Sequence, residues 1–200
     1  ASQYKDYVLF MLFIKYISDK YGDSDDFAPP VVIPPGAGFK DMVALKGKSD
    51  IGDRINTQVI QPLIDANTRL ARSDFPDFND PESGKSKGQF YTPSEVSRIM
   101  AKVLGIGLHN ARASTTAYDP TCGSGSLLLK VAAEAGTHIT LEGQEMDVTT
   151  AGLARMNMIL HDFPTASILT GNTLAEPKFK DGEQLRTYDY VVANPPFSVK

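Results

Sequence analysis

Apolar and polar positions divide the chain into two parts that meet near Gly88. Residues 4–20 are apolar almost all round, which predicts a helix that is buried on several sides. A second helix is predicted to begin at an N-cap, Asp50, because apolar residues follow it at helical spacing. These apolar positions are Ile51, Ile55, Val59, Leu63 and Leu70. We therefore expect residues 1–85 to form a mainly helical domain, with a polar linker over residues 73–87.

After Gly88, short β-prone runs alternate with helical ones. A capping box formed by Thr92 and Glu95, with Pro93 at the first helical position, predicts a helix that ends at about Leu104. The strands are expected near residues 115–119, 139–145, 166–170 and 188–193, and two further helices near residues 126–135 and 148–160. Alternation with glycines at strand ends is typical of a parallel, doubly wound α/β sheet of the Rossmann-like kind. We expect residues 88–200 to form this domain.

Composition and charge narrow the class of protein. A net charge of −4 argues against a freestanding nucleic-acid-coating protein, but it leaves DNA open as a substrate if a partner supplies the phosphate contacts. The single cysteine, Cys122, excludes an internal disulfide and fits a reducing compartment. The longest apolar run, residues 8–14, is too short to cross a bilayer. A cytoplasmic protein without membrane attachment is expected, and the three histidines and Cys122 show no spacing that predicts a metal site.

Polar groups stand at the ends of four predicted strands. The first strand runs into a Gly-x-Gly turn over residues 119–126, and Glu145 ends the next strand, 26 residues after Asp119. Asn172 and Asn194 follow the third and fourth strands. Glycines allow a ligand to approach the backbone closely, and an acidic residue at the second strand end can accept hydrogen bonds from a ribose. Taken alone, the glycine turn is equally well explained as a tight strand-to-helix connection.

Three segments resemble the cofactor and catalytic motifs of adenine-N6 DNA methyltransferases. They read DPTCGSGS over residues 119–126, GQEMD over residues 143–147 and NPPF over residues 194–197. The run GQFYTP over residues 88–93 resembles an additional cofactor motif that lies upstream in one subgroup of this family. The resemblance implies an S-adenosylmethionine-dependent enzyme.

The resemblance also implies roles for individual residues. Glu145 takes the ribose of the cofactor, Met146 packs against its adenine ring, and Asn172 accepts from its adenine amino group. The methionine end is lined by Phe90, Tyr91, Thr92 and Pro93. The amino and carboxylate groups are held by Asp119, Thr121 and the backbone of Gly123, Ser124 and Gly125.

The NPPF segment is the most specific signal for catalysis. The exocyclic nitrogen of adenine is a poor nucleophile because its lone pair is delocalised into the ring. The side-chain oxygen of Asn194 and the carbonyl oxygen of Pro195 can accept its two hydrogens, and the prolines, including Pro196, restrict the backbone. Phe197 offers a face on which an extruded base can stack. A purely structural explanation of the NPPF segment is a turn that ends the strand, with Phe197 in the core.

Two N-terminal stretches, residues 4–19 and 56–69, resemble the N-terminal helical domain of methylation subunits of type I restriction-modification systems. This resemblance implies double-stranded DNA as substrate and an assembly with a specificity subunit, a restriction subunit and a second methylation subunit. It also implies that the methyltransferase domain is truncated at its C-terminal end. Two alternatives remain open: an N-methyltransferase with the same NPPF motif that acts on a protein glutamine or an rRNA guanine, and a non-catalytic module that binds DNA or assembles a complex.

Overall fold

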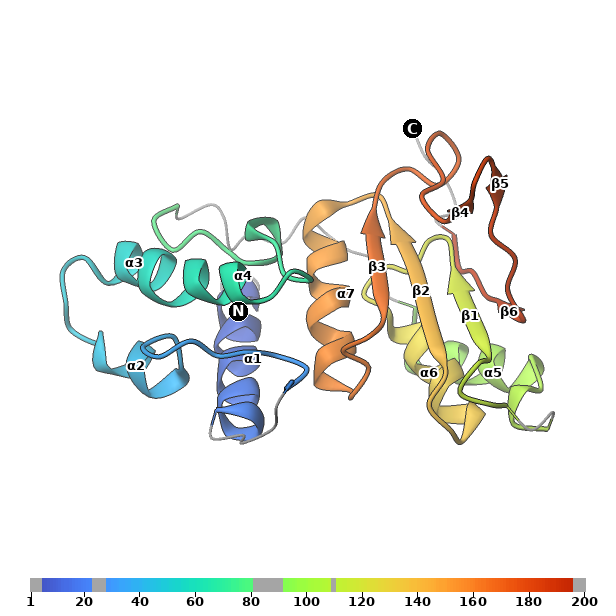
Figure 1. The fold of residues 1–200 in the computed structure, drawn as a ribbon, viewed down its shortest axis with the longest axis horizontal. Coiled ribbons are helices and arrows are strands. Elements are labelled where there is room, and N and C mark those ends of the chain that lie inside the picture. The colour runs from blue at the N-terminus through green and yellow to red at the C-terminus, as the bar shows by residue number, and fades with distance from the viewer. Residues whose placement is uncertain (1–4, 23–27, 81–91, 109–110, 196–200) are drawn as a thin grey trace. The chain divides into compact units, whose positions relative to one another are not determined.

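The computed structural model describes residues 5–22, 28–80, 92–108 and 111–195 (Figure 1). The chain divides into two compact units, residues 1–89 and residues 90–200. Within the described residues, no helix combines the length and the hydropathy that a bilayer span requires.

The described residues of the first unit form helices joined by loops. Helix α1 (Lys5–Tyr21) matches the helix predicted over residues 4–20. Four of its side chains are at most 1% exposed and recur at helical spacing: Phe10, Phe13, Ile14 and Ile17. Val8 and Leu12 are about half exposed, at 48% and 59%, so the expected burial on several sides is not seen. A short helix that the sequence pattern did not predict, α2 (Phe39–Ala44), follows α1.

The predicted second helix is a run of three helical segments. These are α3 (Ile51–Arg54), the π-helix η2 (Ile55–Ile60) and α4 (Gln61–Ala66). Asp50 is the N-cap residue as predicted, but its carboxylate accepts from Arg54 Nε at 2.8 Å and does not cap the backbone. The helix ends before Leu70, contrary to the prediction, because Asn67 is extended and exchanges hydrogen bonds with the backbone of Val32.

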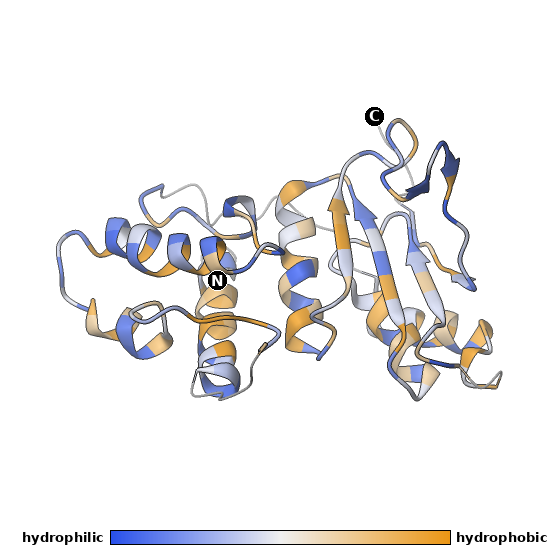
Figure 2. Cartoon of the chain, viewed as in Figure 1, coloured by the Kyte–Doolittle hydropathy of each residue, from blue (hydrophilic) through white to orange (hydrophobic). Residues whose placement is uncertain are grey.

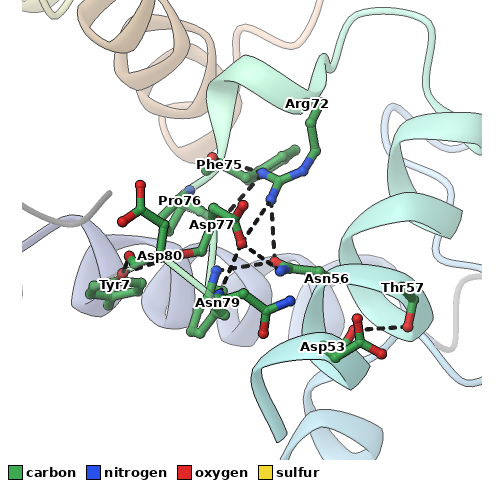
Figure 3. Close-up of polar contacts among 11 residues, drawn as sticks. Tyr7, Asp53, Asn56, Thr57, Arg72, Phe75, Pro76, Asp77, Asn79 and Asp80 are labelled. Carbon is green, nitrogen blue, oxygen red and sulfur yellow. Dashed lines mark hydrogen bonds and ion pairs between the residues drawn. The ribbon is translucent and has the colours of Figure 1, made fainter. Parts of the chain in front are cut away.

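The segment after α4 is held against the helices by the network in Figure 3. It includes the 3-10 helix η3 (Arg72–Asp74). The Asn56 amide, at the start of the π-helix, donates to Asp77 Oδ1 at 2.7 Å, and the Tyr7 hydroxyl lies 2.8 Å from the carbonyl oxygen of Asp80. The backbone N–H of Asn79, the Asn56 amide and the Arg72 guanidinium together hold the pKa of Asp77 below its usual range. The polar residues 72–80, which composition assigned largely to a linker, therefore fold onto this unit.

The second unit contains the predicted parallel sheet. Its strands are β1 (Thr116–Asp119), β2 (Thr140–Glu145), β3 (Ser167–Thr170) and β6 (Tyr190–Val191), in the spatial order β3-β2-β1-β6 and all parallel. The helices are α5 (Ser94–Val103), the 3-10 helix η4 (Ile106–Leu108), α6 (Ser126–Ala135) and α7 (Val148–Leu160). The predicted α/β class with crossover helices is thus confirmed.

The apolar core lies between the sheet and its helices. Its strand side chains include Ala117, Leu141 and Ile168, which are at most 4% exposed, and α6 contributes Leu128 and Val131. Successive strand residues face opposite sides of the sheet, so Tyr118 and Glu142 lie on the other face. In the described part of the chain, the long connection between β3 and β6 contacts this face.

The connection between β3 and β6 contains an antiparallel hairpin that the sequence pattern did not predict. Its strands are β4 (Lys180–Asp181) and β5 (Gln184–Leu185), and β4 is strongly hydrophilic in Figure 2. Glu142 Oε1 accepts from Arg186 at 2.7 Å, and Glu142 Oε2 accepts from the Tyr188 hydroxyl. The Tyr188 ring stacks on Tyr118 with centroids 4.6 Å apart. These contacts attach the connection to β1 and β2.

Candidate functional site

Strand β1 lies at the point where the order of the sheet reverses. The chain proceeds from β1 to β2 and β3 on one side and returns to place β6 on the other side. In open α/β sheets, ligands bind at the carboxyl ends of the strands next to such a reversal. The glycine loop after β1 and Asn194 after β6 flank this point, so the strand order brings together two segments more than 60 residues apart in sequence.

The glycine loop is fixed on its inner side and open at Gly123. Gly125 has a φ of +77°, and a Cβ on it would lie 2.4 Å from Met158 Cε of α7. The Asn157 side chain, also on α7, donates to the carbonyl oxygen of Ser124 at 3.0 Å. Gly123 has a φ of +55°, and a Cβ there would meet nothing within 4 Å. The loop therefore presents open backbone at Gly123 while α7 supports it.

Glu145 is bound to the glycine loop itself. One carboxylate oxygen accepts from the Gly123 N–H at 3.0 Å and the other from the Asp147 N–H at 2.9 Å. The side chain is half-buried, so its remaining acceptor capacity can serve a ligand. The residue predicted to take a ribose and the loop predicted to approach the cofactor are thus in direct contact.

Asp119 is the buried acid of the site, with 1% of its surface exposed. Its carboxylate accepts from the Thr121 N–H at 2.9 Å. The pKa of Asp119 is raised from its ordinary value to about 7, mainly by burial and also by the nearby negative charge of Glu145, while the Thr121 N–H opposes the shift. A cationic group placed against this carboxylate would favour its charged form.

The end of β3 carries Asn172, which is exposed. Its side-chain oxygen accepts from the backbone N–H groups of Leu174 and Ala175, at 3.0 and 3.2 Å, and so organises its own turn. Met146, which follows β2, is 60% exposed. Leu174, which the sequence did not single out, is 96% exposed on the Asn172 turn.

Asn194 is held by a residue of the upstream motif. Its Nδ2 donates to Thr92 Oγ1 at 2.9 Å. The predicted capping box is therefore wrong: α5 begins at Ser94, its N-cap is Pro93, and no side chain caps it. The Thr92 hydroxyl, which was expected to cap the helix, is occupied by Asn194 instead.

The remaining predicted site residues lie outside the described residues. These are Phe90, Tyr91, Pro196 and Phe197. Pro195 and Asn194 are both exposed, and Pro93 is exposed at the start of α5. No group of three or more His, Cys, Asp or Glu side chains that could hold a metal ion occurs in the described part of the chain.

Gln144 supports the site and was not recognised from the sequence. It is fully buried in β2, and its backbone carbonyl oxygen accepts from the Cys122 N–H at 3.0 Å. Its side chain donates to the carbonyl oxygen of Glu176 and accepts from the Lys178 N–H, both at 2.9 Å. Gln144 thus connects the glycine loop and the segment after β3. A polar amide side chain next to the end of a predicted strand was the available signal.

Both units of the chain are similar to domains of known proteins. Residues 77–200 match the model of the family described as N-6 DNA Methylase, and residues 1–92 match the HsdM N-terminal domain. The MpnII methylase subunit of a type I restriction enzyme from Mycoplasma pneumoniae is 37% identical over 58% of this chain and 23% of its own length. The MjaVIII methylase subunit from Methanocaldococcus jannaschii is 30% identical over 81% of this chain and 30% of its own length.

A solved structure shows the same fold. The methyltransferase subunit of a type I restriction-modification system from Streptococcus thermophilus superposes with a TM-score of 0.76 at 21% identity, over 99% of this chain and 60% of that one. The chain spans about a quarter to a third of the length of the two curated relatives described above. The family match covers more than half of the chain and includes every strand of the parallel sheet. The chain therefore belongs to the N-6 DNA methylase family and carries an HsdM N-terminal domain ahead of its methylase domain.

Proposed function

We propose that this chain is part of a modification subunit that transfers a methyl group from S-adenosylmethionine to N6 of adenine in double-stranded DNA. The observation that carries the proposal is the position of Asn194. This exposed asparagine follows the strand next to β1, and its amide nitrogen is bonded to Thr92. No hydrogen bond to its side-chain oxygen occurs among the described residues, which leaves that oxygen available as an acceptor.

The residues at the carboxyl ends of β1 and β2 fit S-adenosylmethionine. Gly123 offers backbone that a ligand can approach, and Glu145 offers a half-buried carboxylate to ribose hydroxyls. Asp119 suits an ammonium group, because a positive charge would offset the cost of ionising a buried acid. Met146 is exposed where a ring could pack. The cofactor supplies an electrophilic methyl group attached to a sulfonium.

On the β6 side, the chain supplies acceptors for the substrate amine. The Asn194 side-chain oxygen and the Pro195 carbonyl oxygen accept the two hydrogens of the adenine amino group. Each accepted bond favours localisation of the nitrogen lone pair, and positive charge that develops on the nitrogen strengthens it. Phe197 stacks on the extruded base in this proposal.

A type I complex explains the charge of the chain. With a net charge of −4, these residues are poorly suited to bind the DNA backbone alone. A specificity subunit that reads the sequence and contacts phosphates would supply what is lacking, and the relatives described above are methylase subunits of type I enzymes. We propose that a second methylation subunit and a restriction subunit complete the assembly.

Methyl transfer by the full-length subunit, reassembled with its specificity subunit, tests this function. Duplex DNA is incubated with S-adenosylmethionine that carries a labelled methyl group, and the nucleosides are then identified by mass spectrometry. We expect N6-methyladenine, and we expect the Asn194→Ala variant to produce far less. Label in cytosine, in RNA or in a protein glutamine, with none in adenine, would overturn the proposal.

A further inference from the structure

Thr92 and Asn194 are joined across the second unit. Asn194 follows β6 and Thr92 immediately precedes the N-cap of α5, 102 residues away in sequence. The hydrogen bond runs from Asn194 Nδ2 to Thr92 Oγ1 at 2.9 Å, a normal length for this type of bond. Thr92 is half-buried and Asn194 is exposed. The threonine is thus the better fixed of the two partners.

We infer that Thr92 is a positioning residue for Asn194: its hydroxyl holds the amide nitrogen so that the amide oxygen is directed to the substrate amine. This inference rests on the proposed function. An asparagine side chain ends in one acceptor and one donor group, and rotation by half a turn exchanges them. With the nitrogen outward, the amide would present hydrogens to an amine that also carries hydrogens, and the acceptor would be lost.

The hydroxyl suits this task because it can accept from the amide nitrogen. When a donor amine occupies the oxygen side of the Asn194 amide, Thr92 satisfies the nitrogen side at the same time. A side chain without an acceptor would leave Asn194 exposed to water and free to rotate. Ordering such a side chain at the moment of reaction costs free energy that a preorganised group avoids.

The same contact explains why the upstream motif belongs to the catalytic site as well as to the cofactor site. Thr92 was assigned from the sequence to the methionine end of the cofactor, where its hydroxyl hydrogen is still available to donate. Its oxygen accepts from Asn194 in the structure. One hydroxyl can fill both roles, since it carries one donor and two acceptor sites.

The test compares Thr92→Val with Thr92→Ser in the reassembled full-length complex. Valine has the shape of threonine without a hydroxyl, whereas serine keeps the hydroxyl. Single-turnover methylation is measured at saturating cofactor and DNA, and thermal melting checks folding. We expect the rate to fall on the order of tenfold for Thr92→Val and to stay within about threefold of wild type for Thr92→Ser. Equal rates for Thr92→Val and wild type, or equal losses in both variants, would overturn the inference.

A double-variant comparison separates positioning from a general effect on the fold. In the Asn194→Ala background, Thr92→Val should slow the reaction further by less than about twofold, because the group it positions is gone. The full loss persisting in that background would show that Thr92 acts by another route. The proposed function has its own criterion, the identity of the nitrogen that wild type methylates. If that nitrogen is not adenine N6, the same rate ratios are measured on the substrate found.

Discussion

On the β2 side of β1, backbone and carboxylate groups form several hydrogen bonds with one another. On the β6 side, among the described residues, the Asn194 side chain forms one hydrogen bond, to Thr92. Glu145 accepts from Gly123, and the Cys122 N–H bonds to the β2 backbone. Strand β6, by contrast, pairs with β1 over two residues, and the asparagine beyond it is exposed. The β2 side, which we expect to bind the cofactor, is therefore fixed by hydrogen bonds between the strands and the glycine loop. The β6 side, which we expect to meet the base, is fixed by a short strand pairing and a side-chain hydrogen bond.

The largest effect is expected from a substitution on the β6 side of the site. Asn194→Ala removes an acceptor that matters most as charge develops on the adenine nitrogen. We expect single-turnover methyl transfer to fall on the order of 100-fold or more, with cofactor affinity nearly unchanged. Quench-flow measurement on the reassembled complex and calorimetry with S-adenosylmethionine provide the two readouts. A normal rate of transfer would remove the catalytic assignment.

The counterpart on the β2 side is Glu145→Ala. It removes charge-assisted hydrogen bonds to the ribose, so we expect cofactor binding to weaken by roughly 1.5–3 kcal/mol. Because Glu145 also holds the Gly123 N–H, a melting curve is needed to show that the loop still folds. Calorimetric affinity equal to that of wild type, in a folded variant, would place the ribose elsewhere.

Asp119 should make both the stability of the protein and its affinity for the cofactor depend on pH. Its folded pKa of about 7 lies above the ordinary value of 3.8, so its contribution to the free energy of unfolding is present at low pH and is lost as pH rises through about 7. Cofactor binding should show the opposite trend, since an ammonium group prefers the ionised acid. We expect affinity to rise severalfold between pH 6 and 7.5, as Asp119 becomes ionised. Titrations with Asp119→Asn should lack this rise; the same slope in that variant would assign it to another group.

The smallest expected effect uses two glycines in matched positions. Gly123 lies in the loop and Gly136 caps α6, with φ values of +55° and +66°, and neither would bring a Cβ within 4 Å of another group. Each Gly→Ala change should lower the free energy of unfolding by about 1–2 kcal/mol through backbone strain. Only Gly123→Ala should also weaken cofactor binding. Equal cofactor affinities in the two variants would show that the ligand does not approach Gly123.

Elements with a long apolar pattern were predictable from the sequence. Helices α1 and α6 and strand β1 bury residues at a regular period, and that period is visible along the chain. The π-helix Ile55–Ile60 was not predicted, because its change of hydrogen-bond register leaves the apolar spacing almost unaltered. The β4–β5 hairpin was missed because two-residue exposed strands carry no alternation.

The candidate site could be predicted as a set of strand ends, but not as a set of contacts. Glu145 and the glycine loop were both identified, and their strands proved to be neighbours. The Thr92–Asn194 bond was not foreseen, because local pattern alone suggested that Thr92 caps a helix. A short polar side chain next to a proline has both options, and only the folded chain decides between them.

The buried thiol of the glycine loop offers a way to measure how often this loop opens. Cys122 is 5% exposed and packs beside Gly143, where a Cβ would come within 3.0 Å of its Sγ. Burial raises the pKa of the Cys122 thiol well above its ordinary value, and an unionised, covered thiol reacts slowly with alkylating reagents. Since these 200 residues contain no other cysteine, the rate of alkylation would report how often the loop opens and exposes the Cys122 thiol. A cofactor that binds this loop would lengthen the interval between openings, so ligand binding could be timed without any introduced label.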